Sequence, residues 1–284
     1  MGQSTSLSPQ SEVKSGTKVM ETKRSHLGAL LAAGSLFTRL PFWRLRELTR
    51  EDYEDALSWW PVIGLVTGGV LAGSFCLYSL VLPPEVALVL ALVSRLFLTG
   101  GFHEDGLGDF FDGFGGGRTK EQILSIMKDS HVGSYAVLAF VLYYLLYWSS
   151  ASSIPGDHLP LVLLACDVTG KCSSLLQVQL LPYARRTEEC KVGVVYRQMS
   201  WLPLLLGISL LITTQGLAFS WLFVEYFYIV LPFALPLLTS LGLIFYLRKR
   251  IGGYTGDTCG ALCLLCELVA LLSYTIFAHM ITIY

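Results

Sequence analysis

The stretch WLPLLLGISLLITTQGLAFSWLF, residues 201–223, decides the fold class of this chain. It contains no charged side chain, and most of its residues are leucine, isoleucine, phenylalanine, tryptophan or alanine. A transmembrane α-helix needs about 20 predominantly apolar residues in succession. The stretch is therefore predicted to cross a lipid bilayer as a helix.

Six further stretches of similar character indicate that the chain crosses the bilayer about seven times. Of its 284 residues, 53% are hydrophobic and only 14% are charged, whereas about 25% are charged in an average soluble protein. We therefore predict an all-α fold, a polytopic integral membrane helical bundle. The predicted spans are residues 59–82, 86–100, 134–152, 159–181, 201–223, 229–247 and 258–283.

The amino-terminal part is predicted to differ from this bundle. Residues 1–26 are polar and rich in Ser and Lys, which is typical of a disordered tail. Residues 27–38 are apolar but too few to cross a bilayer, so we expect a short re-entrant or interfacial segment. Residues 27–284 are predicted to form a single membrane-embedded catalytic domain.

The positions of Lys and Arg predict the orientation, because cytoplasmic loops retain these residues. With the amino terminus inside, every Lys and Arg except Arg95 and Lys171 lies in a cytoplasmic segment. The amino terminus and the loops 101–133, 182–200 and 248–257 are therefore predicted to be cytoplasmic. The formal net charge of -1 gives no basic field that would attract nucleic acid, so no nucleic-acid partner is expected.

The densest group of polar residues is GGFHEDGLGDFFDGFGGGR, residues 100–118. Asp105, Asp109 and Asp112 are spaced so that a turn or two of helix would place all three carboxylates on one face. Three carboxylates repel one another unless a cation lies between them. Mg²⁺ prefers oxygen ligands and usually takes one or two protein carboxylates together with substrate phosphates. The spacing therefore predicts a magnesium site for phosphoryl transfer, with Asp105, Asp109 and Asp112 as metal ligands.

Glycines and a cation in the same segment favour phosphate binding. Gly113 and residues 115–117 allow backbone N–H groups to approach an anion closely, and Arg118 supplies positive charge nearby. The segment is not a Walker P-loop, because Arg118 stands where the Lys is required and Asp112 stands where the first Gly is required. The alternative interpretation is a solvated turn, in which the charges serve solubility. His103 alone could orient a carboxylate, bind metal or act as a base.

Two further polar motifs fall in the predicted cytoplasmic loops. Lys128 and Asp129 suit a phosphate anchor and a metal or hydroxyl ligand, and an ordinary interfacial ion pair explains them equally well. Asp257 follows a glycine turn, where an acid is also simply a good helix N-cap. Three further cations could bind a polyphosphate, namely Arg185, Arg250 and Lys171. The alternative explanation is the general retention of Lys and Arg on the cytoplasmic side.

Three ordered motifs resemble the cobalamin synthase family, whose members are also called adenosylcobinamide-GDP ribazoletransferases. The first contains Gly-Gly-x-His-x-Asp-Gly-x-x-Asp-x-x-Asp-Gly-x-Gly-Gly-Gly and ends at Gly117. The other two are Met127-Lys128-Asp129-Ser130-x-x-Gly133 and Gly252-Gly253-x-Thr255-Gly256-Asp257. With Arg39-Leu40-Pro41 and Trp60-Pro61-x-x-Gly64, the resemblance extends from about residue 27 to near the end of the chain.

The resemblance implies a magnesium-dependent enzyme of the bacterial or archaeal plasma membrane, the cell inner membrane. Members transfer the cobinamide phosphate of adenosylcobinamide-GDP to the ribose 3'-hydroxyl of α-ribazole, or of its 5'-phosphate, and release GMP. The catalytic residues expected on this basis are His103, Asp105, Asp109 and Asp129. The substrate-binding residues expected are Arg118, Lys128, Lys171, Arg185, Arg250 and Asp257.

Departures from the family pattern and two other protein classes qualify this interpretation. Phe110 and Phe111 replace small residues and could reshape the pocket, and Ala136 stands where Gly is usual. Glu104 stands where an apolar residue is usual, so it could alter the charge around a metal or simply face solvent. CDP-alcohol phosphotransferases also carry Asp residues spaced three and four apart on membrane helices, but their Ala-Arg pair is missing after Asp105. A membrane transporter would explain the spans and the intramembrane Asp167 and Lys171. A homo-oligomer is compatible with the sequence.

Overall fold

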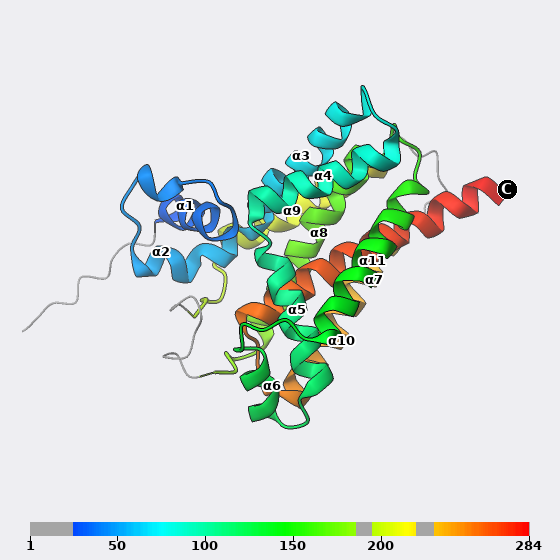
Figure 1. Ribbon diagram of the computed structural model, residues 1–284. Helices are drawn as coiled ribbons and strands as arrows, with labels where there is room; N and C mark the ends of the chain where they lie inside the picture. The colour runs from blue at the N-terminus through cyan, green and yellow to red at the C-terminus, as the bar shows by residue number, and fades with distance from the viewer. Residues whose placement is uncertain (1–24, 186–194, 220–229, 284) are drawn as a thin grey trace, which may run out of the picture.

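The computed structural model describes residues 25–185, 195–219 and 230–283, and these residues form helices without any strand. Figure 1 shows long helices packed as a bundle, with a smaller group containing α1 and α2 at one end. The predicted all-α fold is confirmed. In chain order the α-helices are α1 His26–Phe37, α2 Arg50–Asp55, α3 Trp60–Ser79, α4 Pro84–Thr99, α5 Phe102–Gly116, α6 Lys120–Ile126, α7 Ser134–Ser152, α8 Leu159–Leu180, α9 Trp201–Phe219, α10 Leu231–Arg250 and α11 Gly256–Ile283, with short 3₁₀ turns at Phe42–Arg44 and Ala56–Trp59.

Six of the seven predicted spans correspond to described helices, whereas the predicted span 86–100 is too short alone and is long enough only together with the helix that follows it. These six helices are long and apolar enough to cross a membrane, namely α3, α7, α8, α9, α10 and α11, and the bent pair α4 and α5 makes a seventh if it is counted as one span. The predicted boundaries of 134–152 and 159–181 correspond to α7 and α8 within one residue. Residues 201–219 of the opening stretch form α9, and the next residues lie outside the described part.

The polar segment after α4 is a helix, and our prediction of a loop over 101–133 is wrong for most of its length. The chain turns at Gly100 and Gly101, whose φ angles of 70° and 71° lie in the left-handed region that glycine adopts readily. The axes of α4 and α5 differ by 92° across this turn. A second short helix, α6, begins at the capping box formed by Thr119 and Gln122.

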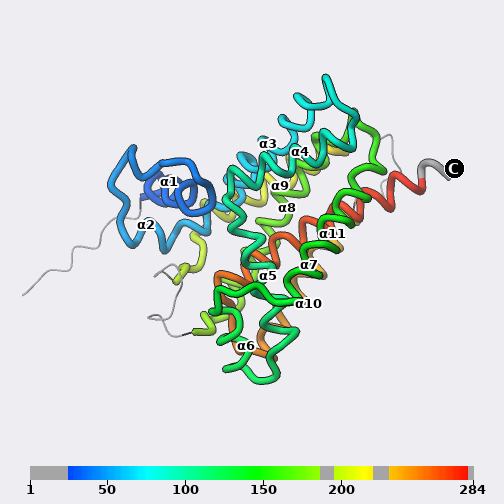
Figure 2. Tube along the Cα trace, in the orientation of Figure 1, coloured from blue at the N-terminus to red at the C-terminus, as the bar shows by residue number. Residues whose placement is uncertain are grey.

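Helix α5 lies along the first half of α7 and runs in the opposite direction. Near its start, Glu104 accepts a hydrogen bond of 3.2 Å from Tyr144, and near its end Asp112 accepts one from the backbone at Gly133. Tyr144 lies about 15 Å along α7 from its first residue at 1.5 Å per residue. The carboxylate-bearing helix is therefore part of the bundle, beside a membrane-spanning helix, as Figure 2 also shows.

Close glycine contacts hold α5 against α11. A Cβ atom at Gly106 would lie 2.8 Å from the carbonyl oxygen of Asp257, and one at Gly260 would lie 3.0 Å from that of His103. No side chain larger than hydrogen fits at either position without a shift of the backbone. The start of α5 is thus packed directly onto the start of α11.

The amino-terminal prediction is tested in part. Residues 1–24 of the expected tail lie outside the described residues. The apolar segment 27–38 corresponds to α1, a helix of 12 residues, which is too short to cross a bilayer. Ser25 caps α1 by accepting a hydrogen bond from the backbone of Gly28.

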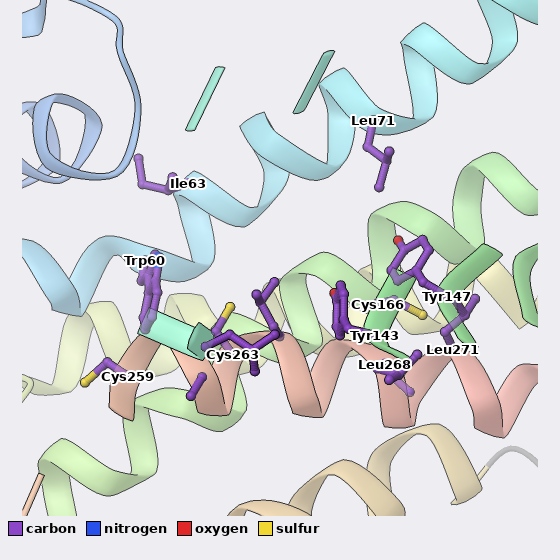
Figure 3. Packing of buried hydrophobic residues seen from close by; sticks show 14 of the residues in the cluster. Trp60, Ile63, Leu71, Tyr143, Tyr147, Cys166, Cys259, Cys263, Leu268 and Leu271 are labelled. Atoms are coloured by element: carbon purple, nitrogen blue, oxygen red, sulfur yellow. The ribbon is translucent and has the colours of Figure 1, made fainter. Parts of the chain in front are cut away.

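Apolar side chains form both the core and the outer surface of the bundle, as expected for a protein in lipid. Figure 3 shows part of the core, in which Cys259 and Cys263 of α11 lie among buried hydrophobic residues. Helix α8 is the most buried of the spanning helices. The outer face of α7 is aliphatic and exposed, through Val137, Leu138, Val141, Leu142 and Leu145.

Candidate functional site

A cavity of about 170 Å³ lies between α5, the start of α7 and the connection that precedes α7. Two of the three sequence motifs meet in this cavity. The acidic motif contributes one helical face, and the motif at 127–133 contributes an irregular segment opposite to it. The lining residues are Asp105, Gly108, Asp109, Asp112, Lys128, Asp129, Ser130, His131, Val132, Ala136 and Phe140.

The three aspartates of α5 share one face of the helix, as their spacing predicted. All three line the cavity. Asp105 is exposed, whereas Asp109 and Asp112 are half-buried. Gly108 permits α7 to approach this face, since a Cβ there would lie 2.7 Å from the ring of Phe140. The face therefore combines one exposed and two half-buried carboxylates with a closely packed neighbouring helix.

Asp112 holds the beginning of α7. One of its carboxylate oxygens accepts a hydrogen bond of 2.7 Å from the backbone N–H of Gly133, and the other accepts one of 3.0 Å from Ala136. These donors belong to the first turn of α7, where backbone N–H groups have no partner within the helix. A Cβ at Gly133 would lie 2.5 Å from the carboxylate. Asp112 thus positions the two halves of the site relative to each other.

We expect Asp112→Ala to destabilise the protein, because it removes both hydrogen bonds from the end of α7. The loss of a capping carboxylate costs about 1 to 2 kcal/mol. Thermal unfolding of the protein in lipid nanodiscs measures the effect, and Gly133→Ala should lower Tm in the same direction by displacing the carboxylate. Asp157→Ala, at an exposed position in the α7–α8 connection, is the control. An unchanged Tm for Asp112→Ala would rule out the capping role.

Asp129 is paired with a residue that the sequence analysis did not single out. His131 Nδ1 lies 2.5 Å from Asp129 Oδ1, which also accepts a hydrogen bond of 3.1 Å from the His131 backbone. The hydrogen bond from the His131 side chain lowers the pKa of Asp129, and the carboxylate raises the pKa of His131. Both side chains are exposed, and both line the cavity. The position of His131 two residues after Asp129 was the signal for this pair, because Asp side chains commonly bond to backbone two residues on.

His103 lies apart from the carboxylates. Its imidazole is buried and stacked on Trp60, with ring centroids 5.4 Å apart, and on Phe37 at 6.2 Å. Residues two apart on a helix point about 200° away from each other, at 100° per residue, so His103 faces away from Asp105. Its Nε2 atom has no hydrogen-bond partner among the described residues. The predicted catalytic role of His103 has no support from its position.

Glu104 faces neither solvent nor the cavity. It is buried and accepts the hydrogen bond from Tyr144 on α7. The interpretation that Glu104 faces solvent is therefore wrong. The side chain instead joins α5 to the middle of α7.

Most of the other predicted cations lie outside the cavity. Lys171 is buried and bonds to Asp167 on its own helix, away from the cavity. Arg250 donates a hydrogen bond of 3.1 Å to the carbonyl oxygen of Gly117 and lies over the rings of Phe114 and Tyr246. Arg118 is exposed at the end of α5. Of the predicted cations, Lys128 alone lines the described cavity.

The third motif reaches α5 at Gly106, outside the described cavity. Asp257 Oδ2 accepts a hydrogen bond of 3.2 Å from Arg185, and both side chains are largely buried. Asp257 lies in the first turn of α11, next to Gly106 of α5. Arg185 and Asp257 thus form an ion pair that supports α5, although they do not line the described cavity.

The oxygen-rich lining suits a magnesium ion. The cavity presents carboxylates and a hydroxyl, which are the hard ligands that Mg²⁺ prefers. Among the described residues, no three His, Cys, Asp or Glu side chains are grouped closely enough to hold a metal by themselves. Asp112 is engaged with α7, and Asp105 and Asp109 are the other two carboxylates of α5 that line the cavity. Two protein carboxylates with substrate oxygens match the usual magnesium site.

Comparisons with known proteins agree with the motifs. Residues 29–275 match the family model described as cobalamin-5-phosphate synthase. An adenosylcobinamide-GDP ribazoletransferase of Clostridium acetobutylicum is 36% identical over 228 residues, which cover 80% of this chain and 87% of that protein. One of Acetivibrio thermocellus is 34% identical over 266 residues, covering 89% and 99%.

A relative of the same name from Shewanella pealeana is 34% identical over 245 residues, covering 85% of this chain and 92% of that protein. No solved structure matches the chain. The family model spans the acidic helix, the motif at 127–133 and the start of α11. With three motifs in order and relatives aligned over most of their length, the chain belongs to the cobalamin-5-phosphate synthase family.

Proposed function

We propose that this protein transfers the cobinamide phosphate of adenosylcobinamide-GDP to the ribose 3'-hydroxyl of α-ribazole or of α-ribazole 5'-phosphate. The relatives carry the name of this activity. The hydroxyl oxygen would form a bond to the phosphorus atom next to cobinamide. The bond from that phosphorus to the bridging oxygen would break, GMP would leave with the bridging oxygen, and the hydroxyl proton would pass to a base.

The observation that carries the proposal is that the acidic helix and the motif at 127–133 face one cavity. A diphosphate needs positive charge and a metal, whereas a hydroxyl nucleophile needs an acceptor for its proton. Lys128 provides the positive charge, and Asp105 and Asp109 provide oxygen ligands for the metal. Asp129 provides the proton acceptor. A transporter requires no such combination, and the CDP-alcohol phosphotransferase alternative lacks support from the family comparison.

Asp105 and Asp109 are proposed to hold Mg²⁺, and Asp112 to keep their helix in place against α7. When bound, the ion would neutralise charge on the diphosphate and on the departing GMP. Lys128, on the opposite wall, would bind a phosphate oxygen by a charge-assisted hydrogen bond. These roles leave Asp112 structural, which differs from the expectation that all three carboxylates bind metal.

Asp129 is proposed to accept the proton of the attacking hydroxyl. Its carboxylate is ionised near neutral pH, since its pKa is lowered by the hydrogen bond from His131. The same hydrogen bond fixes the orientation of the carboxylate. His131 would keep its hydrogen bond to Asp129, which keeps the pair oriented during the transfer.

The protein is proposed to lie in the plasma membrane with this cavity on the cytoplasmic side. The basis is the distribution of Lys and Arg, which are retained in cytoplasmic loops. Labelling of a cysteine placed at Ser130 with a membrane-impermeant reagent tests the orientation. Labelling of intact cells, with no increase after lysis, would contradict it.

The reaction itself is tested with purified protein in lipid nanodiscs, supplied with adenosylcobinamide-GDP, α-ribazole and Mg²⁺. We expect GMP and a cobamide to appear in equal amounts by chromatography, and neither to appear without α-ribazole. A parallel incubation with α-ribazole 5'-phosphate identifies the preferred acceptor. Folded protein that releases no GMP above the enzyme-free control with either acceptor would exclude the proposed activity.

A further inference from the structure

Four charged side chains lie together inside the bundle, apart from the carboxylate cavity. Arg95 comes from α4, Asp167 and Lys171 from α8, and Glu267 from α11, and all four are buried. Ionisable groups are costly within a membrane unless they are paired. Two cations and two anions balance each other here.

Arg95 joins two helices through a single nitrogen atom. Its Nη1 atom donates a hydrogen bond of 3.3 Å to Asp167 of α8 and another to Glu267 of α11. Tyr147 of α7 donates a hydrogen bond of 3.0 Å to the same oxygen of Glu267, and in Figure 3 Tyr147 lies between the helices near α11. The Arg95 guanidinium also lies 5.6 Å from the centroid of the Tyr147 ring. The network therefore ties α4 to three other helices.

The other cation of the group makes a different kind of contact. Lys171 bonds to Asp167 four residues earlier on the same helix, so it connects no two helices. Thr67 of α3 donates a hydrogen bond of 2.7 Å to the Asp167 carboxylate. Asp167 thus keeps partners on α3 and α8 even without Arg95.

Glycines make room for this network. A Cβ at Gly68 of α3 would lie 3.0 Å from the Asp167 side chain, and one at Gly170 of α8 would lie 3.0 Å from that of Glu267. The helices approach each other closely at the level of the charges. The packing around the network is therefore specific, because a larger residue at either glycine would push the partners apart.

Arg95 lies about one turn before the break that separates α4 from α5. Helix α4 packs mainly against α3, and its ionic ties to α8 and α11 run through Arg95. Helix α5, beyond the break, packs against α11 through Gly106 and His103. Arg95 and the α5 contacts therefore fix the two arms of the bend onto the same helix, α11.

We infer that Arg95 is a positioning residue for the carboxylate cavity. It holds α4 against α8 and α11, so that the bend at Gly100 and Gly101 directs α5 toward the segment 127–133. This inference rests on the proposed function, since it explains how the carboxylates come to face Lys128 and Asp129. A misplacement of a catalytic group by about 1 Å can reduce turnover about 10²-fold.

A role in positioning is distinguishable from a role in stability by a paired substitution. Arg95→Met leaves Glu267 buried without its cation, and an unpaired buried charge destabilises a protein strongly. Arg95→Met/Glu267→Met removes both partners, and replacing a buried ion pair by apolar residues is often neutral for stability.

We expect the double variant to recover the Tm of the unmodified protein in nanodiscs, while kcat stays about 10²-fold lower. Arg95→Lys, which can retain one carboxylate partner, should give an intermediate kcat.

A second buried polar cluster provides the matched control. Gln215 of α9 donates a hydrogen bond of 2.7 Å to Thr169 of α8 and accepts one from Tyr274 of α11. This cluster also ties three helices, but it involves neither α4 nor α5. Gln215→Leu should lower Tm without changing kcat or KM. The inference is overturned if the Arg95→Met/Glu267→Met variant has the kcat of the unmodified protein, as Gln215→Leu is expected to have. It is also overturned if recovery of Tm in the double variant is accompanied by recovery of kcat.

A readout independent of activity follows the position of α5 itself. A Cβ at Gly115 would lie 2.6 Å from the ring of Tyr135, so a cysteine pair at these positions should form a disulfide on mild oxidation. We expect the Arg95→Met/Glu267→Met background to slow this cross-link at least several-fold, and Gln215→Leu to leave its rate unchanged. An unchanged rate in the double-variant background would overturn the inference. Absence of GMP release by the unmodified protein would instead count against the proposed function, and the cross-link would still test Arg95.

Discussion

Asp109→Asn should lower GMP release by about 10³-fold while the protein folds and inserts normally. Asp109 lines the cavity at the centre of the carboxylate face of α5, where we propose that it holds Mg²⁺ together with Asp105. A metal ion at a diphosphate contributes several kcal/mol of transition-state stabilisation, and about 1.4 kcal/mol corresponds to a factor of ten in rate. The measurement is the GMP assay over a range of Mg²⁺ concentrations, with Tm determined in the same nanodiscs.

The matched control is Glu121→Gln, which removes one acidic charge from exposed α6, outside the cavity lining. Its turnover and its requirement for Mg²⁺ should equal those of the unmodified protein. Asp105→Asn should resemble Asp109→Asn, because both carboxylates would share the ion. Full turnover by both aspartate variants would remove the metal-binding role from this face of α5.

Lys128→Met should raise KM for adenosylcobinamide-GDP by about 10- to 100-fold. Lys128 faces the acidic helix across the cavity, where its ammonium would bond to a phosphate oxygen. Hydrogen bonds to charged groups contribute about 1.5 to 3 kcal/mol, which corresponds to this range. Initial rates at varied concentrations of each substrate measure the effect, and KM for α-ribazole should change much less.

Lys120→Met tests whether any loss of a nearby cation has the same result. Lys120 is exposed at the start of α6, outside the cavity lining, so its KM values should remain unchanged. Lys128→Arg retains the charge and should recover part of the affinity. Equal KM values for the Lys128 and Lys120 variants would indicate that Lys128 has no specific contact with the substrate.

The spans were predictable because hydropathy depends on local composition. Residues 134–152 are apolar along their whole length, and α7 has the predicted ends. Segment 86–100 was recognised as an apolar helix, but it is only the first arm of the bent pair α4 and α5 and not a span by itself. What the composition could not indicate was that Arg95 pairs with residues far along the chain, at Asp167 and Glu267. Such pairs depend on how the helices pack.

The acidic segment shows a different limit of prediction. Its glycines and carboxylates suggested a loop, since a hydropathy criterion recognises only apolar helices. The segment forms α5 because its glycines permit close packing on α7 and α11, as at Gly106 and Gly108. Helical spacing correctly placed the three aspartates on one face. Applied to His103, the same spacing would have placed it on the opposite face, against Trp60.

The roles of single residues depended most on tertiary structure. Asp112 and Asp109 are equivalent by spacing, and the hydrogen bonds of Asp112 to the first turn of α7 are apparent only in the structure. Asp257, which could equally be an N-cap or a ligand, pairs with Arg185. His131 was overlooked although it follows Asp129 by two residues, and the contact between the two side chains is apparent in three dimensions.

The central claim is that the acidic face of α5 and the segment 127–133 bind the diphosphate together. The most direct measurement is a cryo-EM structure in lipid nanodiscs with Mg²⁺ and adenosylcobinamide-GDP, without the acceptor. We predict density for the diphosphate in the described cavity, with a metal at Asp105 and Asp109 and with Lys128 against a phosphate oxygen. A diphosphate bound elsewhere, with these three side chains out of contact, would contradict the account.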